Sequence, residues 1–299
     1  MVVGREAGAM TLSGVYLPLI TPFAEDGEIA FEALEGLAHA ALEEGAAGLV
    51  ALGTTAEVAT LTQEERRAVV ELCARVCRER GAELVVGAGS SDTRSSAEAL
   101  RALKEWPEVT AALVTVPSFV RPSEVGVLAH FTALSEQTPV PIVVYNIPYR
   151  TGQSVGAATL RRLGELPMVA GVKHAVGGVD QDTVTLLADP PEDFAVLAGD
   201  DPFFSALLAL GASGGILASA HLHTRLFVDL VEAWRSGEVA HARALGHRLS
   251  VMSASMFAEP NPTVIKGVLH AQGRIPTASV RLPLVPASRD SVEAALRLL

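Results

Sequence analysis

Five groups of polar residues stand directly after short apolar runs, and one of them contains a lysine. That lysine, Lys173, closes the run MVAGVKH (168–174), where an ammonium group is partly desolvated and its charged form is disfavoured. A lysine that loses its proton near neutral pH attacks carbonyl carbon, and the resulting imine is an electron sink for a neighbouring carbanion. Strand position alone suits an ion pair at the rim equally well. The other groups are Gly53-Thr54-Thr55-Ala56-Glu57, Pro117-Ser118-Phe119, Tyr145-Asn146 and Gly199-Asp200-Asp201.

The chain contains only three lysines among its 23 basic residues. Lys104 lies in RALKEW and Lys266 in NPTVIKGVLH, both within helical patterns, and we expect both side chains to face solvent. Lys173 is therefore the one lysine whose position suggests chemistry.

The elements that position these groups repeat eight times. Short apolar runs alternate with amphipathic helical stretches, which is the pattern of βα units around a parallel sheet. The runs lack polar alternation, so both faces of each strand should be covered, and eight repeats favour a closed (β/α)8 TIM barrel over an open sheet. The expected strands are GVYLPLI (14–20), AGLVALG (47–53), ELVVGAG (83–89), TAALVTV (110–116), PIVVYN (141–146), MVAGVKH (168–174), FAVLAGD (194–200) and SGGILAS (213–219).

Three regions divide the chain. Residues 1–11 carry no periodicity and predict an N-terminal tail, and residues 12–235 predict the barrel. Residues 236–299 predict a C-terminal helical layer, with segments at 238–257, 261–272 and 289–299 separated by proline-rich breaks.

Composition excludes several classes of function. The net charge of −11 and the absence of a Lys/Arg cluster argue against a nucleic-acid partner. No apolar run approaches the ~18 residues of a membrane span, and the N-terminus lacks the apolar core of a secretory signal, so we expect a cytoplasmic protein without a membrane partner. Cys73 and Cys77, four residues apart in a helical pattern, are expected to be buried free thiols.

The polar groups form an ordered series of motifs. GTTAE (53–57), VYNIPYRTG (144–152), GVKHA (171–175), AGDD (198–201) and FAEPNP (257–262) together resemble the pyruvate-dependent class I aldolase superfamily of dihydrodipicolinate synthase and N-acetylneuraminate lyase. The likeness covers nearly the whole chain after residue 11. It implies a Schiff-base lyase that joins pyruvate to an aldehyde, as a homotetramer. It also implies no cofactor or metal, since the lysine imine supplies the electron sink.

The resemblance assigns roles to individual residues. Lys173 matches the Schiff-base lysine, Tyr145 the tyrosine that moves protons at the imine, and Thr54 the hydroxyl that hydrogen-bonds that tyrosine. Thr55 matches the residue that holds the pyruvate carboxylate, which suits the free N–H groups of a strand-to-helix turn. Ile216, near the end of the eighth strand, matches a further substrate-binding position.

Arg150 indicates which branch of the superfamily the chain resembles most. YNIPYRTG reproduces the pattern YN-x-P-x-R-T-G of the synthase branch, whose arginine receives the carboxylate of the second substrate, and a guanidinium fork fits a carboxylate in two hydrogen bonds. The resemblance therefore favours aspartate 4-semialdehyde as second substrate, in lysine and diaminopimelate biosynthesis. Another pyruvate-dependent aldolase or dehydratase, acting on a 2-keto-3-deoxy sugar acid or similar compound, is the alternative.

Several positions depart from the synthase pattern. Phe119 stands where the branch has a tyrosine that completes a proton relay across a subunit interface, and a phenyl ring has no proton to pass. Either water or Ser118 replaces it, or the chemistry has changed. His174 replaces a glutamate and is a candidate for influencing substrate choice. Because the lysine-inhibitor positions also differ, we predict no inhibition by lysine. These positions are Val58, Gln63, Arg66 and Ser118.

Two other classes of function compete with the lyase. His221 and His223 have ligand-like spacing, and with Asp200 and Asp201 they could form the metal site of a hydrolase on the same barrel. A 2-oxo-acid sensor that kept the pocket without turnover is the second rival, although a sensor needs neither a proton shuttle nor an imine.

Overall fold

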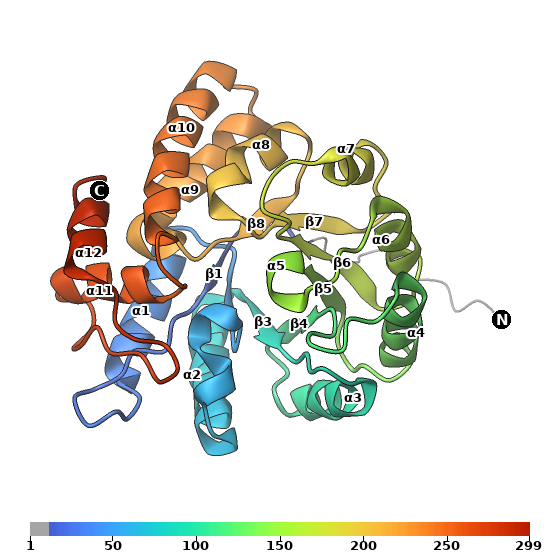
Figure 1. Ribbon diagram of the computed structural model, residues 1–299, viewed down its shortest axis with the longest axis horizontal. Coiled ribbons are helices and arrows are strands. Elements are labelled where there is room, and N and C mark those ends of the chain that lie inside the picture. Colours follow the sequence, from blue (N-terminus) through green and yellow to red (C-terminus); the bar gives the residue numbers. More distant parts are fainter. Residues whose placement is uncertain (1–11) are drawn as a thin grey trace.

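The computed structural model describes residues 12–299, and the expected N-terminal tail, residues 1–11, lies outside the described residues. Eight parallel strands form one closed barrel in chain order, and helices surround it (Figure 1). The barrel closes where the first strand pairs with the last, with Tyr16 opposite Ile216. The predicted (β/α)8 barrel is thus confirmed. The strands are β1 (Gly14–Pro18), β2 (Gly48–Ala51), β3 (Glu83–Gly87), β4 (Val109–Thr115), β5 (Ile142–Asn146), β6 (Val169–His174), β7 (Ala195–Ala198) and β8 (Gly214–Ile216).

The helices follow the strands along the chain. The helix α2 shows how a boundary is set, because the Thr62 hydroxyl accepts the Glu65 N–H while the Glu65 carboxylate accepts the Thr62 N–H. The α-helices are α1 (Phe31–Glu43), α2 (Gln63–Arg80), α3 (Thr93–Ala102), α4 (Glu124–Ser135), α5 (Pro148–Thr151), α6 (Ala157–Gly164), α7 (Gln181–Ala188), α8 (Phe204–Ala209), α9 (Ala220–Arg235), α10 (Val239–Met256), α11 (Thr263–Ala271) and α12 (Arg289–Leu296). The 3-10 turns of residues 12–299 are η1 (Thr54–Ala56), η2 (Val58–Thr60), η3 (Leu103–Glu105) and η4 (Asp201–Phe203).

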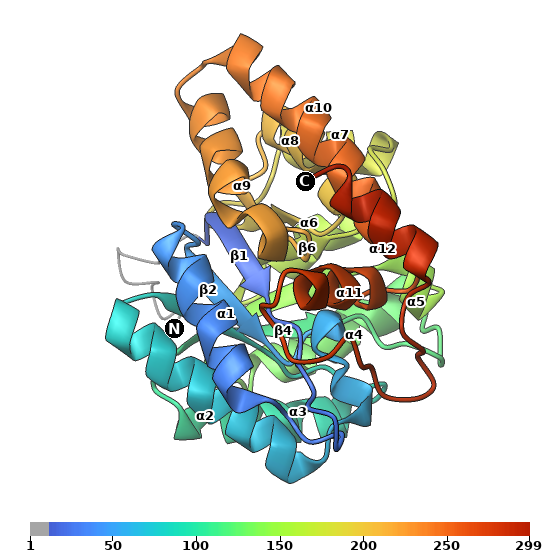
Figure 2. The same cartoon turned by 90° about the vertical axis from the view of Figure 1, so that its left-hand side faces the viewer.

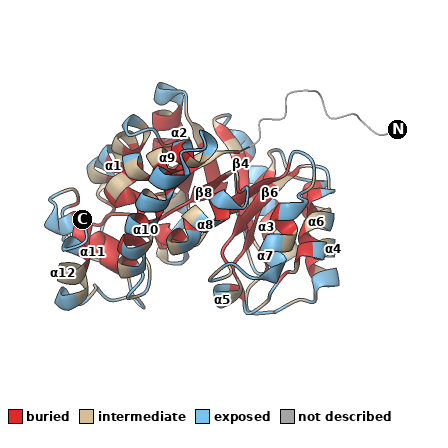
Figure 3. Ribbon diagram, turned by 90° about the horizontal axis from the view of Figure 1, so that it is seen from above, coloured by how far each residue is buried: buried red, intermediate tan, exposed pale blue. Residues whose placement is uncertain are grey.

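Most strand residues are buried, and Figure 3 shows the strands mainly in red. Alternate residues along each strand point into the barrel and out toward the helices. The outward residues pack with the helices in a large outer core, and the inward residues form a smaller inner core. The inner core includes Tyr16, Val50, Val85, Leu113, Val143, Tyr145, Leu197 and Ile216.

The last three helices form a layer beside the barrel. The helix α10 packs against α8 and α9, and α12 packs against α10 and α11, which Figure 2 shows on the side of the barrel that carries α9. The three expected helical segments therefore correspond to α10, α11 and α12, with ends that differ by a few residues.

Two further sequence expectations concern the two cysteines and membrane-spanning segments. Cys73 and Cys77 are free and buried on α2, and burial raises the pKa of the Cys77 thiol to about 12. Within residues 12–299, none of the helices combines the length and apolarity needed to cross a membrane.

Candidate active site

Lys173 and Tyr145 lie side by side inside the barrel. They occupy paired positions on the neighbouring strands β6 and β5, so their side chains point to the same face. Lys173 Nζ lies 4.4 Å from the centroid of the Tyr145 ring, and the two residues are only 6% and 5% exposed. A lysine at the rim would be far more exposed, so the burial that Schiff-base chemistry requires is present. Ile216, the last residue of β8, belongs to the same inner core as Tyr145.

Gly199 makes room for the lysine side chain. It follows β7, and a Cβ built on it would lie 2.9 Å from Lys173 Cε and 3.0 Å from Lys173 Cγ. Real Cβ atoms do not approach other atoms this closely, so any larger residue would push the lysine away from its present position. A glycine is therefore needed after β7 for the Lys173 side chain to keep its position.

Two carboxyl groups directly follow Gly199, those of Asp200 and of Asp201, the first residue of η4. Burial raises the pKa of Asp200, while the Gly177 N–H, 2.6 Å from Asp200 Oδ2, and the Lys173 charge act in the opposite direction. Burial also raises the pKa of Asp201 to about 6, although the Ser219 N–H donates to Asp201 Oδ2 at 2.6 Å. Lys173 thus shares its surroundings with two carboxyl groups that are harder to ionise than usual.

The GTTAE motif forms a tight turn at the end of β2. Thr54, Thr55 and Ala56 make the 3-10 turn η1, whose first N–H groups have no acceptor within the turn itself. The Thr55 hydroxyl accepts a hydrogen bond from Asn261 Nδ2 at 3.0 Å, and the Ala56 carbonyl accepts one from the Thr21 hydroxyl at 2.8 Å. The turn therefore offers backbone donors while its own atoms are held from two sides.

Glu57 ends this turn and makes a buried ion pair with Lys266 of α11. Lys266 Nζ lies 2.6 Å from Glu57 Oε1, and the two side chains are 0% and 1% exposed. The expectation that Lys266 faces solvent is therefore wrong, because the helix buries this face against the barrel and supplies a carboxylate as partner. Lys104, by contrast, is exposed as expected.

A cleft of about 1060 Å³ opens above Tyr145. Thr54 and Tyr145 both line it, so the structure brings the expected hydroxyl and the expected phenol to one cavity. The cleft extends over α2 and α3, and Val58, Gln63, Arg66 and Ser118 also line it. The Ser118 hydroxyl lies 3.2 Å from the Ser91 hydroxyl in its wall.

Phe119 does not line this cleft, although its neighbour Ser118 does. The Phe119 side chain is 94% exposed, and its neighbour Val120 is 60% exposed. Phe119 and Arg121 both have left-handed backbone, with φ of 68° and 46°, a conformation that costs energy for side chains of this size. Arg121 Nε donates to the Gly152 carbonyl at 2.7 Å and so fixes the loop against the end of α5. The loop thus presents an apolar ring outward on a constrained backbone.

Arg150 stands on the short helix α5, directly after β5 (Figure 1). It is exposed, and its guanidinium carbon lies 5.8 Å from the centroid of the Tyr149 ring. The structure does not bring it into contact with Lys173 or Tyr145. Arg150 follows the C-terminal end of β5, the strand that carries Tyr145, and so lies at the end of the barrel where that strand ends.

Two of the three histidines considered for chemistry, His174 and His221, have structural contacts, whereas Nε2 of the third, His223, is buried without a hydrogen-bond partner. His174 is buried with its ring turned outward, where Nε2 lies 2.9 Å from the Thr183 hydroxyl of α7. His221 contacts backbone with both ring nitrogens: Nδ1 lies 2.8 Å from the Ala218 carbonyl and Nε2 accepts from the Ile20 N–H at 3.2 Å. In the described part of the chain, no three His, Cys, Asp or Glu side chains are placed to hold a metal ion.

Two residues of the site were not assigned roles from the sequence, and a third was considered only as a metal ligand. Gly199 lies against Lys173 and Asn261 contacts the Thr55 hydroxyl, while Asp201, the candidate ligand, lies close enough to Lys173 for its pKa to respond to the lysine charge. The motifs AGDD and FAEPNP contained these residues, so the signal was present. Without the fold, however, nothing indicated that Asn261 reaches a turn 206 residues earlier in the chain.

Comparison with known proteins places this geometry in a family. The model of the dihydrodipicolinate synthetase family matches residues 11–299. The chain is 37% identical over 284 residues to 4-hydroxy-tetrahydrodipicolinate synthase 2 of Clostridium acetobutylicum, covering 95% of this chain and 98% of that protein. It superimposes on the crystal structure of dihydrodipicolinate synthase from Thermotoga maritima with a TM-score of 0.92 and 32% identity, covering 97% and 98% of the two chains. The chloride-inhibited synthase from Acinetobacter baumannii, complexed with pyruvate, gives a TM-score of 0.91 and 30% identity, covering 96% and 98%. The buried lysine and tyrosine of this barrel thus belong to a member of the dihydrodipicolinate synthetase family.

Proposed function

We propose that the chain is a 4-hydroxy-tetrahydrodipicolinate synthase, a lyase that condenses pyruvate with aspartate 4-semialdehyde through a Schiff base on Lys173. The observation that carries the proposal is the pairing of Lys173 with Tyr145 inside the barrel, with the ammonium 4.4 Å from the phenol ring centroid. Membership of the synthase family supports the choice of this reaction over other aldol chemistry.

The chemistry follows from an amine placed beside a proton-carrying phenol. The Lys173 amine adds to the ketone carbon of pyruvate, and loss of water gives the imine. Loss of a proton from the adjacent methyl group gives an enamine, whose carbon attacks the aldehyde carbon of the second substrate. The amine of aspartate 4-semialdehyde then attacks the imine carbon and displaces the Lys173 amine, which closes the product ring and frees the enzyme. Tyr145 is placed to carry protons at the imine nitrogen, with the Thr54 hydroxyl as its partner in the same cleft.

Two further groups hold the carboxylates. The backbone N–H groups of η1 and the Thr55 hydroxyl bind the carboxylate of pyruvate, and Ile216 of β8, in the same inner core as Tyr145, contacts the bound substrate. Arg150 receives the carboxylate of aspartate 4-semialdehyde, since its exposed guanidinium stands at the open end of the barrel. Lys173 therefore determines the reaction class, and Arg150 determines which aldehyde is favoured.

The proposal is tested with borohydride and a panel of aldehydes. Borohydride with pyruvate should fix an adduct on the peptide that contains Lys173, as mass mapping would show. A reductase-coupled assay should then find turnover with aspartate 4-semialdehyde and much less with sugar-derived aldehydes. Preference for a sugar-derived aldehyde would overturn the substrate assignment, and absence of the adduct would overturn the mechanism. Turnover with any aldehyde would exclude the sensor.

We also propose a homotetramer in which Phe119 contacts a neighbouring subunit. The exposure of Phe119 and Val120 on a constrained loop supports a contact surface at this position. Sedimentation of the purified protein measures the assembly state. A monomer at working concentrations would contradict the proposal.

Replacing Phe119 by tyrosine is expected to raise turnover with aspartate 4-semialdehyde. The added hydroxyl restores a group that can pass a proton where the synthase pattern has one. The measurement is kcat in the reductase-coupled assay. Phe31→Tyr, a similar change at an exposed position on α1, is the control and should leave kcat unchanged. A rate that is unchanged or lower in Phe119→Tyr would remove the relay argument.

We predict that L-lysine does not inhibit the enzyme. The changed positions Val58, Gln63, Arg66 and Ser118 all line a single cleft, so the altered side chains would meet one ligand together. The initial rate should stay constant as lysine is titrated at subsaturating pyruvate. A micromolar inhibition constant would refute the prediction.

A further inference from the structure

We propose that the Glu57–Lys266 ion pair positions the η1 turn for binding of the pyruvate carboxylate. The inference rests on the proposed function, in which the η1 turn binds pyruvate. The ion pair touches this turn and does not touch the reacting atoms. Glu57 and Lys266 are positioning residues in this sense.

The ion pair is attached directly to the turn. Glu57 follows Ala56 without an intervening residue and has left-handed backbone, with φ of 54° and ψ of 34°. A left-handed glutamate is unfavourable by itself, and both the backbone contacts of Glu57 with Thr54 and Thr60 and the contacts of its side chain offset this cost. Glu57 Oε1 accepts from Lys266 Nζ at 2.6 Å, and Glu57 Oε2 accepts from the backbone N–H of Arg281 at 2.9 Å. Both carboxylate oxygens are thus used to fix the residue that ends the turn.

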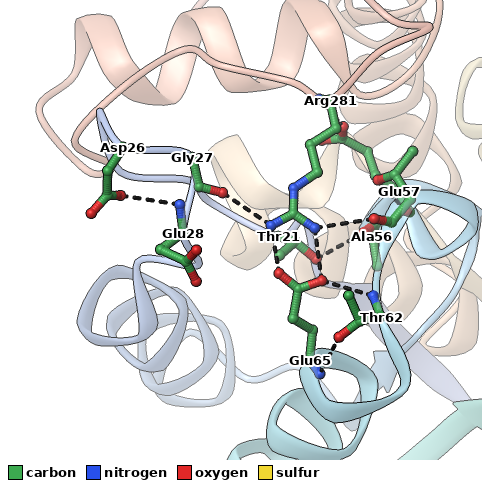
Figure 4. Close-up of polar contacts among 10 residues, drawn as sticks. Thr21, Asp26, Gly27, Glu28, Ala56, Glu57, Thr62, Glu65 and Arg281 are labelled. Atoms are coloured by element: carbon green, nitrogen blue, oxygen red, sulfur yellow. Dashed lines mark hydrogen bonds and ion pairs between the residues drawn. The ribbon is translucent and has the colours of Figure 1, made fainter.

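The anchor extends through a larger polar network (Figure 4). The Arg281 guanidinium donates to Glu65 Oε2 at 2.7 Å and to the Gly27 carbonyl at 3.0 Å. Both cations also lie over the Phe23 ring, with Lys266 Nζ 4.2 Å and Arg281 Cζ 4.4 Å from its centroid. The network therefore joins the turn to α2, to the loop after β1 and to the C-terminal layer.

Stability alone is a poor reason to keep such a pair. Burial lowers the pKa of Lys266 to about 8 even though Glu57 lies beside it, which reflects the cost of desolvating the ammonium. Apolar side chains of similar volume often replace a buried ion pair without loss of stability. What apolar residues cannot supply is a fixed direction for the carboxylate of Glu57, and hence for the turn.

A second contact reaches the turn from the same side. Asn261, two residues before α11, donates to the Thr55 hydroxyl at 3.0 Å. The segment that carries Lys266 therefore meets both the residue proposed to bind pyruvate and the residue that ends the turn. A shift of α11 would move both contacts together.

The experiment is the double variant Glu57→Gln/Lys266→Met. This variant removes both charges, so no unpaired charge stays buried, and the amide can still accept from the Arg281 N–H. Borohydride trapping is measured against pyruvate concentration, without any aldehyde. The pyruvate concentration at half-saturation should rise about tenfold or more, the effect of a poorly placed turn. The thermal midpoint and far-UV circular dichroism establish folding.

The control is Glu83→Gln at the opposite end of the barrel, where Tyr16 donates to Glu83 at 2.5 Å. A merely structural loss reduces the amount of protein trapped and leaves the half-saturation unchanged, which is the result expected for this control. An unchanged half-saturation in the folded double variant would overturn the inference.

If the double variant does not fold, the variant Glu57→Asp tests the inference instead, because it keeps the charge and shortens the side chain. Its half-saturation should also rise, and a value equal to wild type would overturn the inference. Failure of the wild type to be trapped would instead overturn the proposed function.

Discussion

Replacing Lys173 by alanine is expected to lower kcat/KM by more than about 10⁴-fold, because removal of a covalent nucleophile leaves only substrate binding. The variant should also give no adduct with pyruvate and borohydride. Alanine removes the buried ammonium together with its side chain, and the neighbouring Asp200 and Asp201 carboxyl groups, whose pKa burial already raises, can take up a proton, so the barrel should stay folded. The measurements are coupled-assay kinetics, mass mapping after reduction, and circular dichroism.

Lys104→Ala is the matched control for this prediction. Lys104 is the exposed lysine of the three and lies on η3, so its removal should leave both kinetics and trapping unchanged. An adduct that persists in Lys173→Ala and disappears in another lysine variant would move the Schiff base to that residue.

Replacing Tyr145 by phenylalanine is expected to lower kcat by about 10²- to 10³-fold, the usual contribution of a positioned acid-base group. The ring that contacts Lys173 Nζ stays in place, so the half-saturation for pyruvate should change little. Trapping should persist and become slower, since imine formation itself needs proton transfer. Steady-state kinetics and the time course of trapping measure the two effects separately.

Tyr16→Phe is the control for the phenol. Tyr16 lies in the same inner core, and its hydroxyl donates to Glu83 and not to the site. Its loss should lower the thermal midpoint and leave kcat unchanged. An equal loss of kcat in the two variants would indicate general damage to the barrel and would contradict a proton-transfer role for Tyr145.

The strands were predictable because their signal is local. Apolar runs without alternation specify strands covered on both faces, and the eight runs correspond to β1–β8 with ends that differ by at most three residues. Lys173 and Tyr145 were predictable for the same reason, since each closes such a run. Their pairing on adjacent strands then follows from the barrel. The roles of Lys173, Tyr145, Thr54, Thr55, Arg150 and Ile216 stay predictions until the variants are measured.

What was missed depends on contacts between distant segments. The sequence around Lys266 has the periodicity of a helix. That periodicity does not reveal that the buried face of the helix meets the Glu57 carboxylate. The glycine beside Lys173 was one of 26 in the chain, and only the packing of β7 against β6 distinguishes it. The outward direction of Phe119 depends on two left-handed residues in one loop, which no propensity predicts for phenylalanine and arginine.

The anchoring of η1 has a consequence for the order of assembly. The contacts of Glu57 with Lys266 and Arg281 span 209 and 224 residues, and that of Thr55 with Asn261 spans 206. Contacts of such sequence separation form late, because closing a long loop costs entropy before the contact is gained. On the ribosome, a chain that has completed all eight strands would still lack these contacts until α11 emerges. We therefore expect nascent barrels to acquire affinity for pyruvate last, when synthesis is almost complete.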